Sequence, residues 1–271
     1  MSCKICKSKN NQFYKGKILM KYDVSYYQCE SCKFIETEEP YWLDEAYSSA
    51  ITHLDIGLLN RNLYLLKEIP KIIDALYPKA KSFLDYGGGY GVFVRMMRDL
   101  GFDFYRYDTY CDNIFAKHFD YQDSKKEKFD IITSFEVFEH LENPLEEISK
   151  MFGFSDTIIF STLLIPQKQS EFNDWWYVSP ETGQHIAFYD KKTFTEIAAH
   201  FKCYYYGNGN NLHVLTKQQL DEQKVNEVFS NKPKNFIQRK FSNKKHILRE
   251  SLINKDLQLI SSLLNSGKIK Q

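Results

Sequence analysis

Residues 82–94 read SFLDYGGGYGVFV. A short apolar run ends at Asp85, and three consecutive glycines follow it, with a fourth at Gly91. The whole chain holds only 12 glycines, so this stretch concentrates them strongly. Glycine supports no side-chain packing and adopts positive φ freely, so the cluster predicts a sharp backbone turn or a ligand that approaches the backbone closely.

The segments around this glycine loop (residues 87–91) alternate between helix and strand patterns. Apolar spacing predicts a helix over 60–76 that Pro70 kinks or splits, a strand over 81–86, a helix over 92–101 and a strand over 102–108. A strand, a glycine loop, a helix and a strand that ends in an acid are typical of a nucleotide site. Asp108 lies where a carboxylate can accept hydrogen bonds from both ribose hydroxyls.

The alternation continues to residue 217. The patterns predict a strand over 129–136, a helix from Pro144, a strand over 156–166, a helix over 191–201 capped by Asp190, and a hairpin over 203–217. These elements predict an α/β fold, namely a Rossmann-like doubly wound sheet with an antiparallel C-terminal edge hairpin. We expect this domain to span residues 41–220.

Four of the six cysteines form two C-x2-C pairs, Cys3 with Cys6 and Cys29 with Cys32. Two such pairs can bring four thiolates to the corners of a tetrahedron, which is the geometry of structural Zn²⁺. Short strand patterns between the pairs predict a small zinc ribbon over residues 1–40, whose folding free energy the metal would supply. Four reduced structural cysteines are the alternative, and neither possibility identifies a substrate.

The net charge of +1 argues against a chain that binds nucleic acid over its whole surface. No apolar run reaches the roughly 18–20 residues of a membrane span, and the N-terminus lacks a signal-peptide pattern, so we expect a cytoplasmic protein. Residues 231–271 hold ten basic and two acidic residues. Their apolar spacing predicts a C-terminal helical extension over 221–271, packed on the domain or on the partner subunit of a homodimer. A surface for an anionic substrate, nucleic acid or a membrane is the alternative.

The motif DYGGGYG, the acid after the second strand and the segment FDIITSFEVFEHLENP (129–144) resemble class I S-adenosylmethionine-dependent methyltransferases over about residues 55–217. With the cysteine pairs ahead of it, the chain is similar to zinc-ribbon methyltransferases of bacterial capsule and surface-polysaccharide biosynthesis. Ribosomal RNA methyltransferases with a zinc knuckle share this layout. The resemblance implies an S-adenosylmethionine-dependent methyltransferase (EC 2.1.1.-).

The resemblance also implies a donor site at the glycine loop, where side chains would block the methyl donor and backbone N–H groups can bind its anionic end. We expect donor contacts from Asp85, Gly87, Gly88, Gly89, Gly91, Asp108, Thr109, Phe135, Glu136 and Arg61. Residues 109–128 are too few for a full strand–helix unit, so the adenine contact stays open between Asp120 and Tyr121. The alternatives are an NAD site, a plain turn and, for Arg61, a surface ion pair.

An alcohol acceptor needs a base and an aligned methyl group, so histidines and carboxylates after the later strands are candidates. The predicted catalytic residues are His185, His140 and Glu136. The long irregular segment between Pro166 and Asp190 supplies further candidates. The predicted acceptor contacts are Trp175, Trp176, Tyr177, Glu181, Gln184 and, from the segment after the ribbon, Tyr47. Structural roles are the alternatives: a loop-pinning bond for His185, helix capping for His140 and core covering for the tryptophans.

The leading hypothesis is therefore methylation, by preference at oxygen, of a small molecule. The acceptor would be a sugar, a nucleotide-sugar, or a phosphorylated or phosphoramidate precursor of capsular polysaccharide. An RNA methyltransferase that uses the ribbon and tail is a second hypothesis, against which the negative charge of residues 1–230 argues. A non-catalytic binding subunit is a third, against which the complete glycine loop argues.

Overall fold

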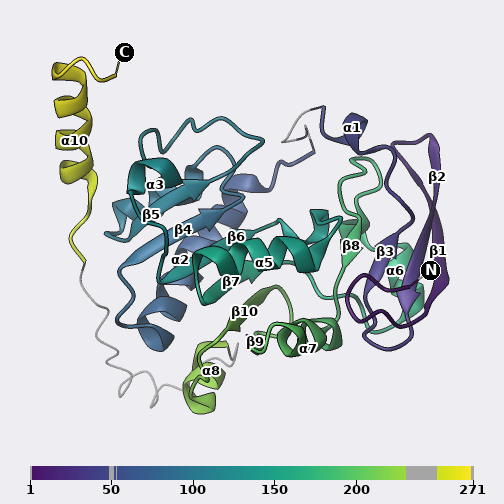
Figure 1. Ribbon diagram of the computed structural model, residues 1–271. Helices are drawn as coiled ribbons and strands as arrows, with labels where there is room; N and C mark the ends of the chain where they lie inside the picture. The colour runs from purple at the N-terminus through teal and green to yellow at the C-terminus, as the bar shows by residue number, and fades with distance from the viewer. Residues whose placement is uncertain (1, 49–51, 53, 230–248, 270–271) are drawn as a thin grey trace, which may run out of the picture. The chain divides into compact units, whose positions relative to one another are not determined.

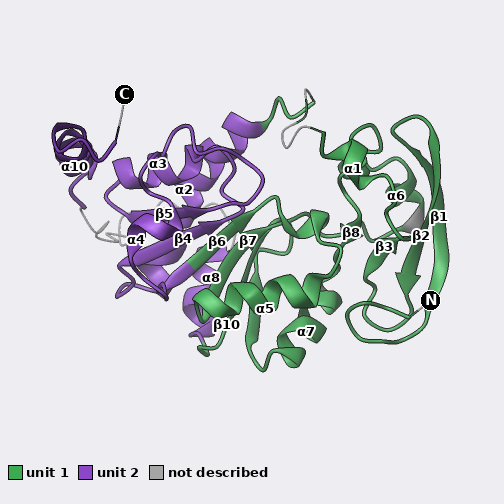
Figure 2. Cartoon of the chain, turned by 45° about the horizontal axis from the view of Figure 1, so that its top comes forward, with its two compact units in different colours: residues 1–57, 132–219 green, residues 58–131, 220–271 purple. Residues whose placement is uncertain are grey.

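The computed structural model describes residues 2–48, 52, 54–229 and 249–269 (Figure 1). The chain divides into two compact units, residues 1–57 with 132–219 (unit 1) and residues 58–131 with 220–271 (unit 2) (Figure 2). Residues 230–248 of the predicted C-terminal extension (221–271) lie outside the described part of the chain. No helix among the described residues has both the length and the apolar character needed to cross a bilayer.

The larger of two sheets has six strands. They are β4 (Ser82–Tyr86), β5 (Asp103–Tyr107), β6 (Ile131–Phe135), β7 (Thr157–Ser161), β9 (Tyr204–Gly207) and β10 (Leu212–Thr216). Their order is β5-β4-β6-β7-β10-β9. β4 pairs with β5 and β6 with β7 in parallel, whereas β10 is antiparallel to both β7 and β9. The predicted α/β sheet with an antiparallel C-terminal edge hairpin is confirmed.

Helices precede, connect and follow these strands. They are α2 (Leu58–Leu76), α3 (Val92–Asp99), α4 (Tyr121–Ser124), α5 (Pro144–Phe154), α7 (Lys191–His200), α8 (Glu222–Phe229) and α10 (Ile253–Asn265). Pro70 lies inside α2, which continues through it as one helix. The carboxylate of Asp190 caps α7 by accepting from Lys192 N at 2.7 Å, as predicted. Residues 109–128, all of them described, hold only the four-residue α4 and one bridge, so the expected absence of a strand–helix unit there is confirmed.

The smaller sheet joins two distant parts of unit 1. Its strands are β1 (Asn10–Ile18), β2 (Tyr22–Cys29), β3 (Ile35–Thr37) and β8 (Ala187–Phe188), in that order. β8 comes from the segment between Pro166 and Asp190 that the sequence predicts to be irregular. That segment also contains the short α6 (Gln169–Asn173) and η2 (Trp176–Val178). Because β8 pairs with β3, this segment completes the sheet that begins in the cysteine-bearing N-terminus.

The same two parts of unit 1 share a hydrophobic core. Tyr26 and Ile35 of the N-terminal strands are fully buried in one cluster with Phe172, Tyr177 and Phe188 of the later segment. A buried hydrogen bond adds to this core, since the Trp42 side chain in the N-terminal part donates from Nε1 to Gly183 O at 2.8 Å. Each fully buried large apolar side chain contributes about 1.5–3 kcal/mol. The later segment is thus held by burial as well as by strand pairing.

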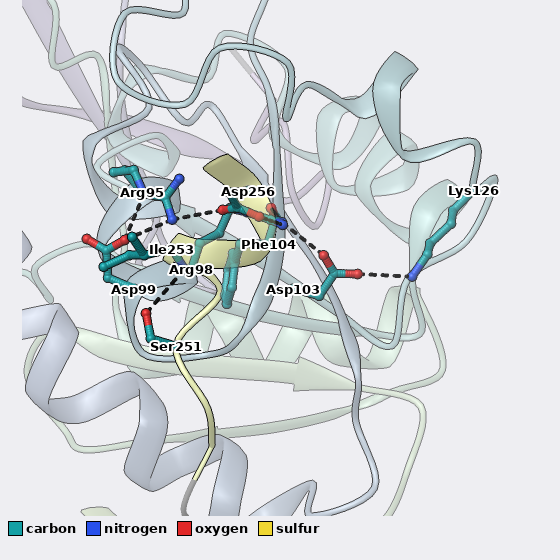
Figure 3. A network of polar contacts seen from close by, with 9 residues as sticks. All are labelled: Arg95, Arg98, Asp99, Asp103, Phe104, Lys126, Ser251, Ile253 and Asp256. Carbon is teal, nitrogen blue, oxygen red and sulfur yellow. Dashed lines mark hydrogen bonds and ion pairs between the residues drawn. The ribbon is translucent and has the colours of Figure 1, made fainter. Parts of the chain in front are cut away.

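In unit 2, a buried ion pair attaches the C-terminal helix α10 to α3 (Figure 3). Asp256 in the first turn of α10 accepts two bonds from Arg98, from Nη2 at 2.8 Å and from Nε at 2.9 Å, and a third from Arg95 at 2.9 Å. Arg98 also donates to Asp103 Oδ1 and to Phe104 O. Burial alone would raise the pKa of Asp256, but the bonds from Arg98 outweigh it and lower that pKa.

We predict that Asp256→Asn lowers the free energy of unfolding by about 3–5 kcal/mol, because it leaves the Arg98 guanidinium buried without its counter-charge. Denaturant unfolding measures the loss, and limited proteolysis should release α10 first. Lys255→Ala, on an exposed neighbouring residue, is the matched control and should change stability by less than about 0.5 kcal/mol. Equal stabilities of the two variants would contradict this account of the ion pair.

A buried histidine in β10 makes the stability of unit 1 sensitive to acid. His213 is fully buried, with Nε2 3.0 Å from Thr162 O and Nδ1 2.9 Å from the Tyr205 hydroxyl. The carbonyl accepts from Nε2 and the hydroxyl can donate to Nδ1, so the neutral ring is fully satisfied. Burial lowers the pKa of His213 to about 4.

Between pH 6.5 and pH 4 the unfolded chain therefore binds a proton at His213 that the folded chain does not. We predict that this group alone removes about 3 kcal/mol of stability as the pH falls through that window. Denaturant unfolding of the wild type and of His213→Gln at several pH values measures the difference. The free energy of unfolding of the variant should fall less steeply than that of the wild type between pH 6.5 and pH 4. Parallel pH profiles for the two proteins would show the assignment to be wrong.

Candidate functional site

The glycine loop of unit 2 follows β4 in a left-handed backbone conformation. Gly87, Gly89 and Gly91 have φ values of 75°, 52° and 84°. The N–H groups of Gly87 and Gly88 both donate to Tyr107 O, at 2.8 and 3.2 Å, which fixes the turn to the end of β5. Side chains with a Cβ rarely adopt such φ values, so the backbone conformation accounts for the glycines at three of the four positions.

The surroundings of the glycines distinguish their roles. A Cβ on Gly91 would lie 2.8 Å from Asn113 Oδ1, and one on Gly88 would lie 3.0 Å from Arg106 Cγ, so a side chain at either position would require its neighbours to shift. A Cβ on Gly89 would meet nothing within 4 Å. Gly89 therefore borders open space, where a ligand can approach the backbone. Gly91 is the N-cap of α3, and helix N-termini favour anionic groups.

Asp108 ties the glycine loop to the chain after β5. Its Oδ2 accepts from Gly89 N at 2.8 Å, and its Oδ1 accepts from Tyr110 N and Cys111 N, each at 2.8 Å. A carboxylate has about four acceptor sites, so Asp108 can still accept from a ligand hydroxyl. Its neighbour Thr109, also predicted as a donor contact, is exposed.

Arg106 is a residue of this site that the sequence analysis missed. Its side chain, 4% exposed, donates from Nε to Gly89 O at 2.5 Å, from Nη1 to Asp120 Oδ1 at 2.7 Å, and from Nη2 to Cys111 O. It links the glycine loop, the chain after Asp108 and Asp120. The signal for this residue in the sequence is a single arginine among the aromatic residues of the predicted strand FDFYRYD (102–108).

The remaining predicted donor contacts of unit 2 have varied surroundings. Asp85 is buried in β4, Arg61 is half-buried in the first turn of α2, and Tyr121 begins α4. Asp120 accepts from Arg106 and from Asn113 Nδ2, the latter at 3.0 Å. Asp120, one of the two candidates for the adenine contact, thus holds the chain after β5 in place through these two bonds.

In unit 1, Glu136 follows β6 with a φ of 55°. Such a conformation costs a non-glycine residue about 1–3 kcal/mol, and it persists only where other contacts stabilise it. Here Glu136 N donates to Ser161 Oγ at 3.0 Å, and the same hydroxyl donates to Glu136 Oε1 at 2.7 Å. Glu136 and Phe135, the last residue of β6, are thereby fixed at the end of the strand.

Four predicted residues of unit 1 lie together next to η1 (Phe138–His140). His140 Nδ1 is 2.9 Å from the Tyr47 hydroxyl and 3.0 Å from Gln184 O. His185 Nδ1 is 2.5 Å from Tyr177 O, and the two imidazole centroids are 4.9 Å apart. The Gln184 side chain donates to Ala46 O at 2.8 Å, which attaches the segment that carries His185 to α1 (Leu43–Ala46).

The predicted aromatic acceptor contacts separate into buried and exposed residues. Tyr177 is 2% exposed, and its hydroxyl is 3.1 Å from Thr162 Oγ1. Burial and the nearby Glu139 carboxylate raise the pKa of Tyr177 well above its usual value, so the hydroxyl keeps its proton. Trp175 packs against Phe172 of the core. Trp176 is 75% exposed, and Glu181 is exposed as well.

The four cysteines of the two pairs converge. Their sulfur atoms all lie within 4.8 Å of one another, with 3.6 Å between Cys3 and Cys32 and 3.4 Å between Cys6 and Cys29. A tetrahedral Zn²⁺ site with Zn–S bonds of about 2.3 Å has sulfur–sulfur edges of about 3.8 Å. Ile5 N and Cys32 N each point at a sulfur, at 3.4 Å. The cysteine quartet therefore fits a closed metal site. A hydrogen bond from Cys32 lowers the pKa of the Cys3 thiol to about 5.

The fold and the glycine loop together define a Rossmann-like α/β protein with a ligand-accessible turn after its first parallel strand. The chain belongs to the methyltransferase domain family, whose family model matches residues 59–204. No curated protein sequence matches the chain.

Several solved methyltransferase structures are similar to the chain in fold. The plantazolicin methyltransferase BpumL, in complex with SAH, is 13% identical, with 66% of this chain and 95% of that chain covered and a TM-score of 0.46. An O-methyltransferase family 2 protein from Planctomyces limnophilus, in complex with apigenin, is 13% identical, with 65% of each chain covered and a TM-score of 0.47. Magnesium protoporphyrin IX methyltransferase from Synechocystis, with bound SAH, is 12% identical, with 64% and 92% covered and a TM-score of 0.45.

Proposed function

We propose that the chain is an S-adenosylmethionine-dependent methyltransferase that methylates a hydroxyl of a small molecule. The observation that carries this proposal is Gly89, which borders open space beside the Asp108 carboxylate in a member of the methyltransferase domain family. A donor that has a ribose and an amino-acid end needs this combination, an accessible backbone next to a hydroxyl acceptor.

The glycine loop and Asp108 bind the donor in this proposal. Asp108 accepts from the ribose hydroxyls, and the N-terminal end of α3 favours the donor's carboxylate. Arg106 does not touch the donor; it positions Gly89 and the chain after Asp108. When bound, S-adenosylmethionine supplies a methyl group on a positively charged sulfur, which makes the sulfide a good leaving group.

The histidine cluster offers candidate groups for the acceptor. A hydroxyl must lose its proton as its oxygen attacks the methyl carbon, and the cluster of His140 and His185 offers imidazole nitrogens for that task. The exposed indole of Trp176 gives an apolar face to a sugar ring. We propose a sugar, a nucleotide-sugar, or a phosphorylated or phosphoramidate precursor of capsular polysaccharide as the acceptor.

Calorimetric titration with S-adenosylhomocysteine tests the donor site. We predict micromolar binding by the wild type and at least about 100-fold weaker binding by Gly89→Val, a loss of about 2.7 kcal/mol, because the new side chain fills the open space. Asp108→Ala should weaken binding as well, since both the ribose acceptor and the anchor of Gly89 are lost.

Gly153→Val is the matched control, because a Cβ on Gly153 also meets nothing within 4 Å but lies in α5 at an ordinary φ. It should bind like the wild type. A folded wild type that does not bind the ligand would overturn the proposal in favour of a non-catalytic subunit. Salt-dependent retention of RNA, with no methylation of sugar phosphates or nucleotide-sugars, would favour the RNA hypothesis.

We also propose that the cysteine quartet binds a structural Zn²⁺. Metal analysis of the purified protein should find one zinc per chain, and Cys32→Ser should lose it together with much of the stability of unit 1, because metal binding supplies folding free energy. Cys203→Ser, at an isolated cysteine, should retain the zinc. A folded, metal-free wild type with four freely reactive thiols would contradict the assignment.

A further inference from the structure

We propose that Glu139, His140 and His185 form a second metal site, which binds one divalent transition-metal ion and is separate from the cysteine quartet. One carboxylate oxygen and one nitrogen of each imidazole lie within 4.8 Å of one another. All three residues belong to unit 1, so the site is complete within one compact body.

The hydrogen bonds of the two histidines fix the tautomer that a metal needs. Gln184 O lies 3.0 Å from His140 Nδ1, and Tyr177 O lies 2.5 Å from His185 Nδ1. A carbonyl oxygen can only accept, so these two contacts are satisfied when each Nδ1 carries the proton and each Nε2 in turn carries the lone pair. The Tyr47 hydroxyl, 2.9 Å from His140 Nδ1, then accepts from the same N–H. Metal-ligating histidines characteristically donate their other ring N–H to a carbonyl or carboxylate in this way.

Glu139 brings negative charge to the same place. Its side chain is fully buried, with 0% of the residue exposed. A carboxylate is costly to bury, and coordination of a cation is one of the few ways to compensate it. A divalent ion beside Glu139 would therefore stabilise the ionised carboxylate in its buried position.

The ligands are held in place by the fold itself. Three bonds join η1 to residues 184–189, the segment that contains β8. They are His140 Nδ1 to Gln184 O at 3.0 Å, Ile186 N to Glu139 O at 2.9 Å, and the Tyr189 hydroxyl to Phe138 O at 2.8 Å. We call these bonds the η1 clamp. Because the clamp fixes both segments, 44 residues apart in sequence, little rearrangement is needed to bind an ion.

The ligand set indicates the kind of metal and its task. Two imidazoles and one carboxylate suit Mn²⁺, Fe²⁺, Co²⁺ or Zn²⁺ better than Ca²⁺, and three protein ligands leave positions open for a substrate oxygen. This inference rests on the proposed function and changes the task of the two imidazoles, which would bind the ion through Nε2 instead of accepting the proton. The ion would bind the acceptor hydroxyl and lower its pKa, so that the proton would leave to solvent. The oxygen then forms its bond to the methyl carbon while the carbon–sulfur bond breaks and its electron pair stays on sulfur.

Titration with Mn²⁺ of the full chain that carries one equivalent of zinc, which the four thiolates bind preferentially, tests the site by electron paramagnetic resonance. Manganese is chosen because a four-thiolate site prefers softer metals. We expect one Mn²⁺ per chain, and at least about tenfold weaker binding by Glu139→Gln and His185→Ala. The matched controls Glu39→Gln and His200→Ala, at exposed residues, should bind as the wild type does.

Two further measurements distinguish failure of the metal site from failure of the donor site and from misfolding of a variant. Pulsed resonance of Mn²⁺ on the wild type should show imidazole nitrogen couplings, which requires no variant to fold. Binding of S-adenosylhomocysteine by Glu139→Gln should be unchanged, so a failed donor site and a failed metal site give different results. Absence of nitrogen couplings, or equal Mn²⁺ binding by wild type and Glu139→Gln, would overturn the proposal.

Discussion

The η1 clamp is the constraint on which the arrangement of unit 1 depends. It holds the turn after β6 against a segment far along the chain, and β8 in that segment completes the sheet that starts at the cysteine quartet. The cysteine-bearing strands, the shared core and the two histidines are therefore parts of one body. The clamp brings the buried Glu139 together with the imidazoles of His140 and His185. Glu139 and His140 follow β6, whereas His185 comes from the later segment, so neither part would form the cluster alone.

In unit 2, charged side chains hold the glycine loop in place. Asp108 and Arg106 both bond to Gly89, one through its N–H and the other through its carbonyl oxygen. The backbone of the glycine loop is thus held from two sides, while its outer side stays open. Farther along, Arg98 and Asp256 attach α10, and a buried pair of this kind gives geometric definition more than net stability.

Much of the fold is predictable from the sequence because its signals are local. The glycine run, the acid after the second strand, Pro144 at a helix start and Asp190 at a cap each act within a few residues. β8 is not predictable, because its two residues carry no strand pattern and depend on pairing with β3. The role of Arg106, the burial of Glu139 and the contact of Asp256 with Arg98 depend on tertiary neighbours. The histidines could be named as candidates, but their hydrogen-bonded tautomers required the structure.

The central claim is that the cysteine-bearing strands and the segment around the η1 clamp unfold as one body. Native-state hydrogen exchange with mass spectrometry, at increasing denaturant, tests it most directly. The account predicts that peptides covering residues 22–37 and 184–189 share one opening free energy and one dependence on denaturant. Loss of protection in 22–37 while 184–189 stays protected would show two independent parts and would contradict it.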